Sequence, residues 1–308
     1  MTTGLLFPGQ GAQFVGMGRD LVETFPAARE RFERADRVLD LPLSRICFEG
    51  PEEELRQTRN TQPAIFVHSM AALAVLESGR SLAFAAAAGH SLGEYSAYVA
   101  AGSLPFDDAL RLVRRRGELM YQAGIDRPGT MAAVLGLTPE ALREAISGIA
   151  GIVVPANLNS PGQIVISGEV EAVGEAMRLC KEAGAKRVVP LEVSGAFHSP
   201  LMEGAARGLE EALAQVSIAP ARVPVYANAS AAPVVEPEDI RKSLARQLLS
   251  PVRWEETIRA MRAAGCERFL EIGPGRVLGG LARSIDRSVS AQSVGTVEEI
   301  ASFDEVAR

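Results

Sequence analysis

Hydrophobic and polar positions along this chain alternate between two patterns, and their order predicts an α/β fold. Short runs with the character of strands occur at residues 5–7, 81–88, 223–228 and 268–272. Longer stretches with helical character occur at residues 20–40, 63–78, 92–101, 107–120, 200–216, 240–249 and 253–264. Strands that alternate with helices in this way are typical of α/β architecture.

The stretch from residue 129 to residue 193 has an order of its own. It reads strand, helix, strand, strand, helix, strand over residues 131–135, 139–147, 152–156, 163–167, 171–183 and 187–193. Thr138 followed by Pro139 marks the start of its first helix. The order βαββαβ is that of a ferredoxin-like unit. We therefore predict a small domain over 129–193, inserted into a larger domain formed by 1–128 and 194–308.

Composition places the chain among ordinary globular proteins. It has 308 residues, enough for about two domains, with 47% hydrophobic and 23% charged residues. Its net charge of −6 argues against partners such as nucleic acids and anionic membranes. No apolar run reaches the roughly 18 residues of a membrane-spanning helix, and no basic segment of a signal peptide precedes Pro8.

Cysteine and histidine usage narrows the setting further. The three cysteines, Cys47, Cys180 and Cys266, lie far apart and form no Cys-x-x-Cys pair, which favours a reducing compartment without disulfides. The three histidines lack the spacing of a metal site, so we expect no metal. These features together predict a soluble cytoplasmic protein.

A strand-to-helix turn carries the first candidate for chemistry. Gly89-His-Ser-Leu-Gly93 fits the Gly-x-Ser-x-Gly pattern, follows an apolar strand and opens a predicted helix, which is the setting of a nucleophile elbow. Glycines allow the sharp turn that lifts Ser91 out of the sheet edge, and the backbone N–H of Leu92 could hold an oxyanion there. Ser91 is therefore a candidate nucleophile. The alternative interpretation is a serine that only caps the helix.

A serine nucleophile needs a base, and His198 is the best placed histidine. It follows a predicted strand, in Ser194-Gly-Ala-Phe-His-Ser-Pro200, where catalytic groups collect in α/β sheets. His90 should project away from the neighbouring Ser91, and His68 has the neighbours of a structural residue. His198 comes too early for the Ser–acid–His order of α/β-hydrolases, and no acid stands out. We therefore expect a Ser–His pair whose imidazole is oriented by a backbone carbonyl.

Arg116 lies on the unexpected face of its predicted helix. On a helix over residues 107–120 it falls within the apolar stripe, while Arg114 and Arg115 point away. A buried guanidinium is costly unless it is paired, either with a structural carboxylate or with an anionic ligand. Because arginine grips a carboxylate with two hydrogen bonds, a dicarboxylic acyl group would be a fitting ligand.

Six motifs in one order give the chain a family resemblance. They are Phe7-Pro-Gly-Gln-Gly-Ala-Gln13, Gly89-His-Ser-Leu-Gly-Glu-Tyr-Ser96, Arg116-Gly117, Asn157-Leu-Asn-Ser-Pro-Gly-Gln163, Gly195-Ala-Phe-His198 and Glu271-Ile-Gly-Pro-Gly275. Over essentially its whole length the chain resembles the malonyl-CoA:acyl-carrier-protein transacylases of bacterial type II fatty acid synthesis. The resemblance implies an α/β-hydrolase-like large domain with an inserted small ferredoxin-like domain.

The resemblance also implies roles for single residues. Ser91 would be the nucleophile, His198 its acid–base partner, and Arg116 the group that binds the free carboxylate of malonate. The backbone N–H groups of Gln10 and Leu92 would form the oxyanion hole, and the backbone carbonyl of Gln247 would orient the histidine. The wall of the pocket would include Gln62, Asn157 and Phe197. A phenylalanine directly before the catalytic histidine favours malonyl over methylmalonyl groups.

The reaction implied by the resemblance is a ping-pong transfer. A malonyl group would pass from malonyl-CoA, through a malonyl-serine, to the thiol of acyl carrier protein. No cofactor is needed, and we expect a monomer that meets its carrier protein transiently. Because carrier proteins and this chain are both acidic, docking needs a local basic patch, for which Lys181, Lys186 and Arg187 are candidates. The alternative interpretation, which we favour for each of them, is an ordinary solvated surface charge.

Three other functions share parts of this pattern. The first is a free-standing acyltransferase that loads a polyketide synthase, with the same chemistry and a different carrier protein. The second is a serine hydrolase or thioesterase, against which the early His198 and the buried Arg116 argue. The third is a carrier-protein-binding module without catalysis, against which the intact Ser91, His198 and Arg116 argue.

Overall fold

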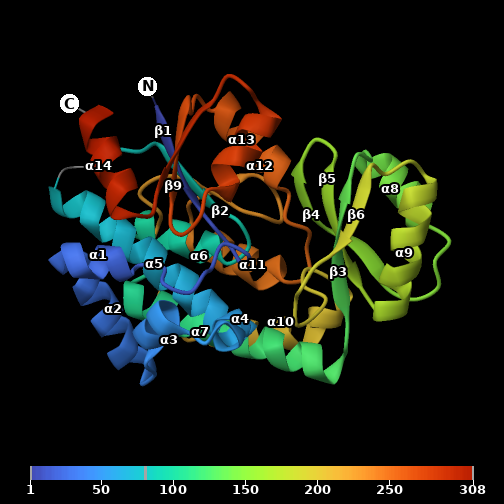
Figure 1. The fold of residues 1–308 in the computed structure, drawn as a ribbon, viewed down its shortest axis with the longest axis horizontal. Helices are drawn as coiled ribbons and strands as arrows, with labels where there is room; N and C mark the ends of the chain where they lie inside the picture. Colours follow the sequence, from blue (N-terminus) through green and yellow to red (C-terminus); the bar gives the residue numbers. More distant parts are fainter. Residues whose placement is uncertain (1, 80–81, 307–308) are drawn as a thin grey trace.

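Two sheets divide the molecule into a larger and a smaller part, which lie side by side (Figure 1). The computed structural model describes residues 2–79 and 82–306. In spatial order, the larger sheet consists of β10 (Ser290–Val294), β9 (Arg268–Ile272), β1 (Thr3–Phe7), β2 (Ala86–Gly89), β7 (Val225–Tyr226) and β8 (Pro233–Val234). Neighbouring strands pair in parallel except β7 with β8.

Helices bury both faces of the larger sheet. In β1, Leu5 and Phe7 pack into one apolar cluster with Phe66, whereas Leu6 packs into a second cluster with Trp254. The helices of this part are α1 (Arg19–Thr24), α2 (Pro26–Leu39), α3 (Leu43–Glu49), α4 (Glu52–Arg56), α5 (Thr58–Gly79), α6 (Gly93–Ala100), α7 (Phe106–Asp126), the 3-10 turn Pro200–Met202, α10 (Glu203–Ala214), α11 (Pro237–Gln247), α12 (Trp254–Ala263), α13 (Val277–Ile285) and α14 (Val297–Val306). None of the helices that the structure describes is long and apolar enough to cross a membrane.

The smaller sheet is antiparallel and has the predicted connectivity. Its spatial order is β4 (Val153–Ser160), β5 (Gln163–Gly168), β3 (Thr130–Leu135) and β6 (Arg187–Pro190). With the helices α8 (Pro139–Ile146) and α9 (Val170–Glu182), the chain order is βαββαβ. The hydroxyl of Thr138 caps α8 by accepting a hydrogen bond from the N–H of Ala141. The predicted fold class is confirmed, and the division into domains at residues 129 and 193 stays a prediction.

A short backbone pairing ties the smaller sheet to the larger part. The N–H of Val252 donates to the carbonyl of Ala156, and the N–H of Leu158 donates to the carbonyl of Val252, both at 2.8 Å. The segment before α12 thus pairs with β4. This pairing holds the edge of the smaller sheet beside the carboxyl ends of the large parallel strands.

Element boundaries differ from the prediction at several places, including residues 20–40 and 81–88. The helix predicted over 20–40 is interrupted at Phe25, which is extended because Pro26 begins α2 and disfavours a helical residue before it. The strand predicted over 81–88 begins as β2 only at Ala86, which pairs with Gly4 near the start of β1. The first residue of that prediction, Ser81, lies outside the described residues.

Candidate active site

Ser91 lies where the chain leaves β2 and enters α6, as predicted. Its φ of 50° is in the left-handed region, a strained conformation for a residue with a side chain. A Cβ on Gly89 would lie 1.9 Å from the carbonyl of Gly93, and one on Gly93 would lie 2.1 Å from the carbonyl oxygen of Phe7. Only glycine therefore fits at both positions of the elbow that presents Ser91.

Asn228, which no pattern in the sequence indicated, holds this strained turn. Its Oδ1 accepts a hydrogen bond from the N–H of Ser91 at 2.6 Å, and its Nδ2 donates to the carbonyl of Gly89 at 2.7 Å. Asn228 follows β7, the strand beside β2. A polar residue at the carboxyl end of a neighbouring parallel strand is the signal that could have found it.

His198 is hydrogen-bonded to Ser91, with 2.8 Å between Nε2 and Oγ. Its Nδ1 faces the carbonyl oxygens of Gln247 at 3.0 Å and Ser250 at 3.1 Å, so Nδ1 must carry the proton and Nε2 is free to accept one. Burial, and then the nearby Arg116 guanidinium, lower the pKa of His198 to about 3. The imidazole is therefore neutral near neutral pH, the state that a general base requires.

Arg116 is fully buried in α7, and all of its hydrogen-bond acceptors are neutral. Nη1 donates to Oε1 of Gln62 at 2.7 Å, and Nη2 donates both to Oε1 of Gln247 and to Oγ of Ser91 at 2.9 Å. Within the described parts of the chain, no carboxylate lies within ion-pair distance of this guanidinium. Arg116 thus has no directly paired carboxylate there. The buried Glu94 attracts its charge from beyond hydrogen-bond distance, and Nη2 faces the nucleophile.

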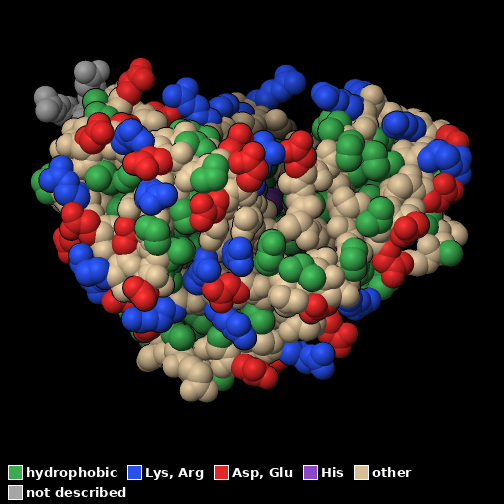
Figure 2. All heavy atoms as spheres, turned by 60° about the horizontal axis from the view of Figure 1, so that its bottom comes forward, with side chains coloured by type: hydrophobic (Ala, Val, Ile, Leu, Met, Phe, Trp, Pro, Cys, Tyr) green, Lys and Arg blue, Asp and Glu red, His purple; other side chains and the backbone are tan. Residues whose placement is uncertain are grey.

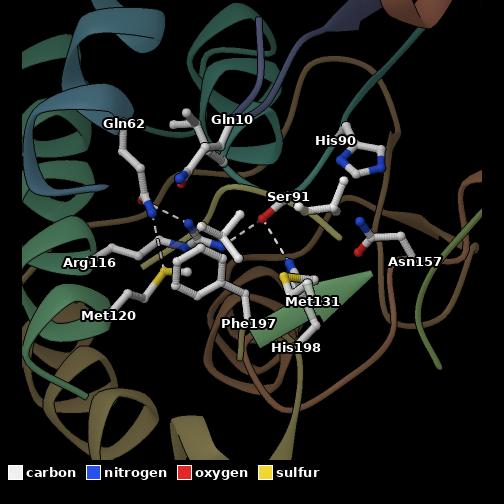
Figure 3. A pocket seen from close by; sticks show the side chains of 13 residues that line it. Gln10, Gln62, His90, Ser91, Arg116, Met120, Met131, Asn157, Phe197 and His198 are labelled. Carbon is white, nitrogen blue, oxygen red and sulfur yellow. Dashed lines mark hydrogen bonds between the residues drawn. The ribbon is translucent and has the colours of Figure 1, made fainter. Parts of the chain in front are cut away.

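The predicted site residues surround one cavity of about 90 Å³ (Figure 3). Eight of the nine line it, namely Gln10, Gln62, Ser91, Leu92, Arg116, Asn157, Phe197 and His198. Gln247 lies behind them and reaches Arg116, Ser91 and His198 through its hydrogen bonds. Among the described residues, nothing accepts a hydrogen bond from the backbone N–H of Gln10 or Leu92. These two donors remain available to a bound molecule.

A larger groove of about 370 Å³ continues from this cavity. It runs between the loop after β1 and the strands of the smaller sheet, and shares Gln10, His90 and Asn157 with the cavity. In Figure 2 the surface is hollowed between the two parts of the molecule, and a histidine side chain shows inside the hollow. The site is thus reached along the junction of the two sheets.

Of the other two histidines, His90 lines the cavity with its ring turned to other partners than Ser91, as expected. The ring of His90 points away from Ser91 in Figure 3, bonds to Oδ1 of Asn159 at 2.9 Å and packs against Trp254. His68 is buried within α5. The proposed docking residues Lys181, Lys186 and Arg187 are exposed on the smaller part, in and after α9.

Comparison with known proteins assigns the chain to a class. Residues 5–301 match the sequence model of the acyl transferase domain, and the chain belongs to that family. Its curated relatives include the malonyl CoA-acyl carrier protein transacylase of Bacillus subtilis, 50% identical over 299 residues, which are 96% of this chain and 94% of that protein. The protein of the same name from Staphylococcus aureus strain MW2 is 41% identical over 98% of both chains. The resemblance predicted from the motifs is confirmed.

Solved structures agree with the family assignment. The acyl-carrier-protein-S-malonyltransferase from Bartonella henselae superposes with a TM-score of 0.95 at 44% identity, covering 99% of both chains. A malonyl-transacylase in complex with a type II polyketide acyl-carrier protein superposes with a TM-score of 0.96 at 42% identity, covering 99% of this chain and 100% of that one.

Proposed function

We propose that this protein transfers malonyl groups from malonyl-CoA to the phosphopantetheine thiol of an acyl carrier protein, and so supplies fatty acid synthesis. The observation that carries the proposal is the position of Ser91 Oγ, 2.8 Å from a neutral histidine nitrogen and 2.9 Å from a buried guanidinium. His198 can take the serine proton, and Arg116 can hold the acyl carboxylate. The names of the relatives point to the same substrates.

The first half-reaction forms a malonyl-serine ester. Ser91 Oγ attacks the thioester carbonyl while His198 Nε2 takes its proton. The N–H groups of Gln10 and Leu92 hold the oxyanion, an effect worth about 3 kcal/mol for each donor. When the intermediate collapses, the carbon–sulfur bond breaks and the coenzyme A sulfur takes the proton from His198.

The second half-reaction runs the same steps with a new nucleophile. The phosphopantetheine thiol gives its proton to His198, and its sulfur attacks the carbonyl carbon of the ester. The oxyanion returns to the same two N–H groups, and collapse releases Ser91 with the proton from His198. When the substrate binds, Arg116 gives up its hydrogen bond to Ser91 Oγ and binds the malonyl carboxylate instead. It keeps this carboxylate through both half-reactions and so holds the acyl group at the reacting centre.

The remaining site residues would shape the pocket. Phe197 narrows it beside His198, which favours malonyl over methylmalonyl groups by the roughly 1–3 kcal/mol that one extra carbon commonly costs. Gln62 holds one arm of Arg116. Asn157 has a buried, unpartnered Oδ1 at the junction of cavity and groove, which suits an N–H of the pantetheine arm. The small insert, placed at 129–193, would close the groove over that arm.

Steady-state kinetics with both substrates test the proposal. We expect parallel double-reciprocal lines when malonyl-CoA is varied at several fixed concentrations of holo acyl carrier protein, because the covalent intermediate separates the two half-reactions. Malonyl carrier protein should accumulate without free malonate. Intersecting lines would contradict the malonyl-serine route, and rapid release of malonate without an acceptor would favour a hydrolase instead.

A polyketide carrier protein is the second candidate acceptor. It is favoured by the 42% identity to the malonyl-transacylase that was solved with such a carrier. Comparing kcat/KM for a fatty acid carrier and a polyketide carrier would decide between them, and we expect the fatty acid carrier to be preferred. We further expect a monomer that needs no cofactor. We expect it to act in the cytoplasm, a reducing compartment, and its three buried, unpaired cysteines are consistent with that setting.

A further inference from the structure

Glu94 is a fully buried carboxylate that the mechanism above does not use. It lies in the first turn of α6, three residues after Ser91, and has no exposed surface. Its Oε2 accepts hydrogen bonds from the N–H of Asn228 at 2.9 Å and from Nε2 of Gln247 at 2.7 Å. The hydroxyl of Ser243 lies 3.5 Å from its other oxygen. A buried carboxylate is costly, and these hydrogen bonds together with the attraction of the nearby Arg116 guanidinium offset part of that cost. The placement calls for a function.

Gln247 is the link between Glu94 and the acyl site. The two ends of its side-chain amide are similar in shape and opposite in hydrogen bonding. Nε2 donates to Glu94 and to the carbonyl of Ser91, and Oε1 accepts from Nη2 of Arg116. A flipped amide would turn its N–H groups toward the guanidinium and its oxygen toward the carboxylate. Glu94 therefore selects the orientation in which Gln247 can bind Arg116.

We propose that Glu94 is a positioning residue for recognition of the acyl carboxylate. By accepting a hydrogen bond from Gln247, it keeps the Gln247 oxygen on Arg116, and so fixes the guanidinium between Gln247 and Gln62 with Nη2 toward Ser91. The inference rests on the proposed function and deepens it, since it concerns the choice between a carboxylated acyl group and an uncharged one.

Two thioesters separate this role from a general structural one. Acetyl-CoA uses the same nucleophile, base and oxyanion donors as malonyl-CoA, and it offers no carboxylate to Arg116. The backbone carbonyl of Gln247, which faces His198, does not move when its side-chain amide rotates. Glu94 also accepts from the N–H of Asn228, so its loss can disturb the Ser91 turn, which both reactions use. The orientation of Arg116 serves only malonylation, so the ratio of the malonylation rate to the acetylation rate should fall. A merely structural residue would slow both equally.

The experiment measures single-turnover acylation of the full-length enzyme by each thioester, using intact-protein mass spectrometry. In Glu94→Ala we expect the ratio of the malonylation rate to the acetylation rate to fall about 10- to 100-fold, the scale seen when residues that orient metal ligands are replaced. Glu94→Gln should restore the malonyl-to-acetyl ratio. Its carbonyl can still accept from Gln247 and Asn228, while its amide N–H faces the Ser243 hydroxyl, which can accept.

Glu271→Ala is the matched control for Glu94→Ala, because Glu271 is another buried carboxylate that accepts backbone hydrogen bonds, from Leu278 and Gly279. Its malonyl-to-acetyl ratio should equal that of the wild type. An unchanged ratio in Glu94→Ala, or a Glu94→Gln enzyme as impaired as Glu94→Ala, would overturn the inference alone. A wild-type enzyme that forms no malonyl adduct would overturn the proposed function as well.

Glu94→Asp keeps the inference testable if the alanine variant does not fold. Shortening the side chain by one methylene draws the carboxylate away from Gln247 while a buried acid is kept. The malonyl-to-acetyl ratio should then fall in the folded enzyme, and a wild-type ratio would overturn the inference.

Discussion

The burial of Arg116 among neutral acceptors is costly, and a ligand carboxylate would offset that cost. Replacing it, as Arg116→Ala, should slow malonylation of Ser91 by about 100-fold or more, because truncating one partner of a buried charge pair costs about 2–5 kcal/mol. Acetylation by acetyl-CoA should change much less. Single-turnover rates with the two thioesters provide the measurement.

Arg115→Ala is the control for this prediction. Arg115 is the neighbouring residue on the same helix, and its side chain is exposed. Its replacement should leave both acylation rates at wild-type values. Equal losses of malonylation and acetylation in Arg116→Ala would show that Arg116 supports the fold of the site and does not select the acyl group.

The neutral state of His198 predicts an unusual pH profile. Its pKa is lowered from 6.5 to about 3, so protonation removes the base only at low pH. Between pH 5 and pH 7 the malonylation rate of the free enzyme should vary less than about twofold. Burial raises the pKa of Glu94 to about 7, but a protonated Glu94 still accepts from Gln247 and should not shape this range. A rate that falls below pH 6.5 as an ordinary histidine titrates would contradict this account.

At the scale of elements, the elbow between β2 and α6 depends on close backbone contact. Gly93→Ala should lower the free energy of unfolding by about 1–3 kcal/mol or more and abolish malonylation, because its Cβ would lie 2.1 Å from the carbonyl oxygen of Phe7. Gly174→Ala is the matched control. It lies exposed in the middle of α9 with no atom within 4 Å of the added Cβ, and should stabilise the protein by about 0.5–1 kcal/mol.

Chemical denaturation and the malonyl adduct together read out these two glycine variants. A Gly93→Ala enzyme with wild-type stability and acylation would mean that the turn can relax. The strain inferred for Ser91 would then have no part in presenting the nucleophile.

The sequence predicts the bounds of helices and strands well where the local residue pattern determines them. It predicts them poorly where a contact with a residue distant in the sequence determines them. Pro63 is an example, since the helix predicted to start there begins instead at Thr58. A proline inside a helix leaves the carbonyl four residues earlier without its donor. Here that carbonyl belongs to Arg59, and the guanidinium of Arg114 donates to it at 2.9 Å. No sequence pattern near residue 63 predicts that a hydrogen-bond donor from another helix will satisfy this carbonyl.

The same distinction applies to the site. Arg116 could be found from helical periodicity, and Ser91 from a local motif at a strand-to-helix turn. Behind them lies a hydrogen-bond network in which the Glu94 carboxylate accepts from the backbone N–H of Asn228 and from the side chain of Gln247. It joins α6, the segment after β7 and the end of α11. By residue type its members are ordinary polar residues, and only the family resemblance pointed to Gln247. Only folding, which brings together residues more than 130 positions apart, shows that they share hydrogen bonds.

At the scale of the whole molecule, two sheets meet along a groove that leads to the nucleophile. The chain carries a net charge of −6, so an acidic carrier protein needs a local basic surface to dock. Replacing Lys186 and Arg187 by alanine should raise the KM for the carrier protein about 3- to 10-fold at low salt, since charges at the rim of an interface act mainly on association. The half-reaction with malonyl-CoA should not change.

Arg45→Ala serves as the control for docking, because it removes an exposed positive charge from α3 in the larger part of the molecule. Its KM for the carrier protein should match that of the wild type. If the double variant of Lys186 and Arg187 also keeps a wild-type KM, the carrier protein docks elsewhere.

The central claim is that Ser91 carries a malonyl group between two thiols. Intact-protein mass spectrometry after brief incubation with malonyl-CoA tests it most directly. We predict one malonyl adduct on the wild type, lost when holo acyl carrier protein is added, absent from Ser91→Ala and weak in Arg116→Ala. An adduct that persists in Ser91→Ala would contradict the assignment of the nucleophile. Free malonate without any adduct would contradict acyl transfer itself and indicate a hydrolase.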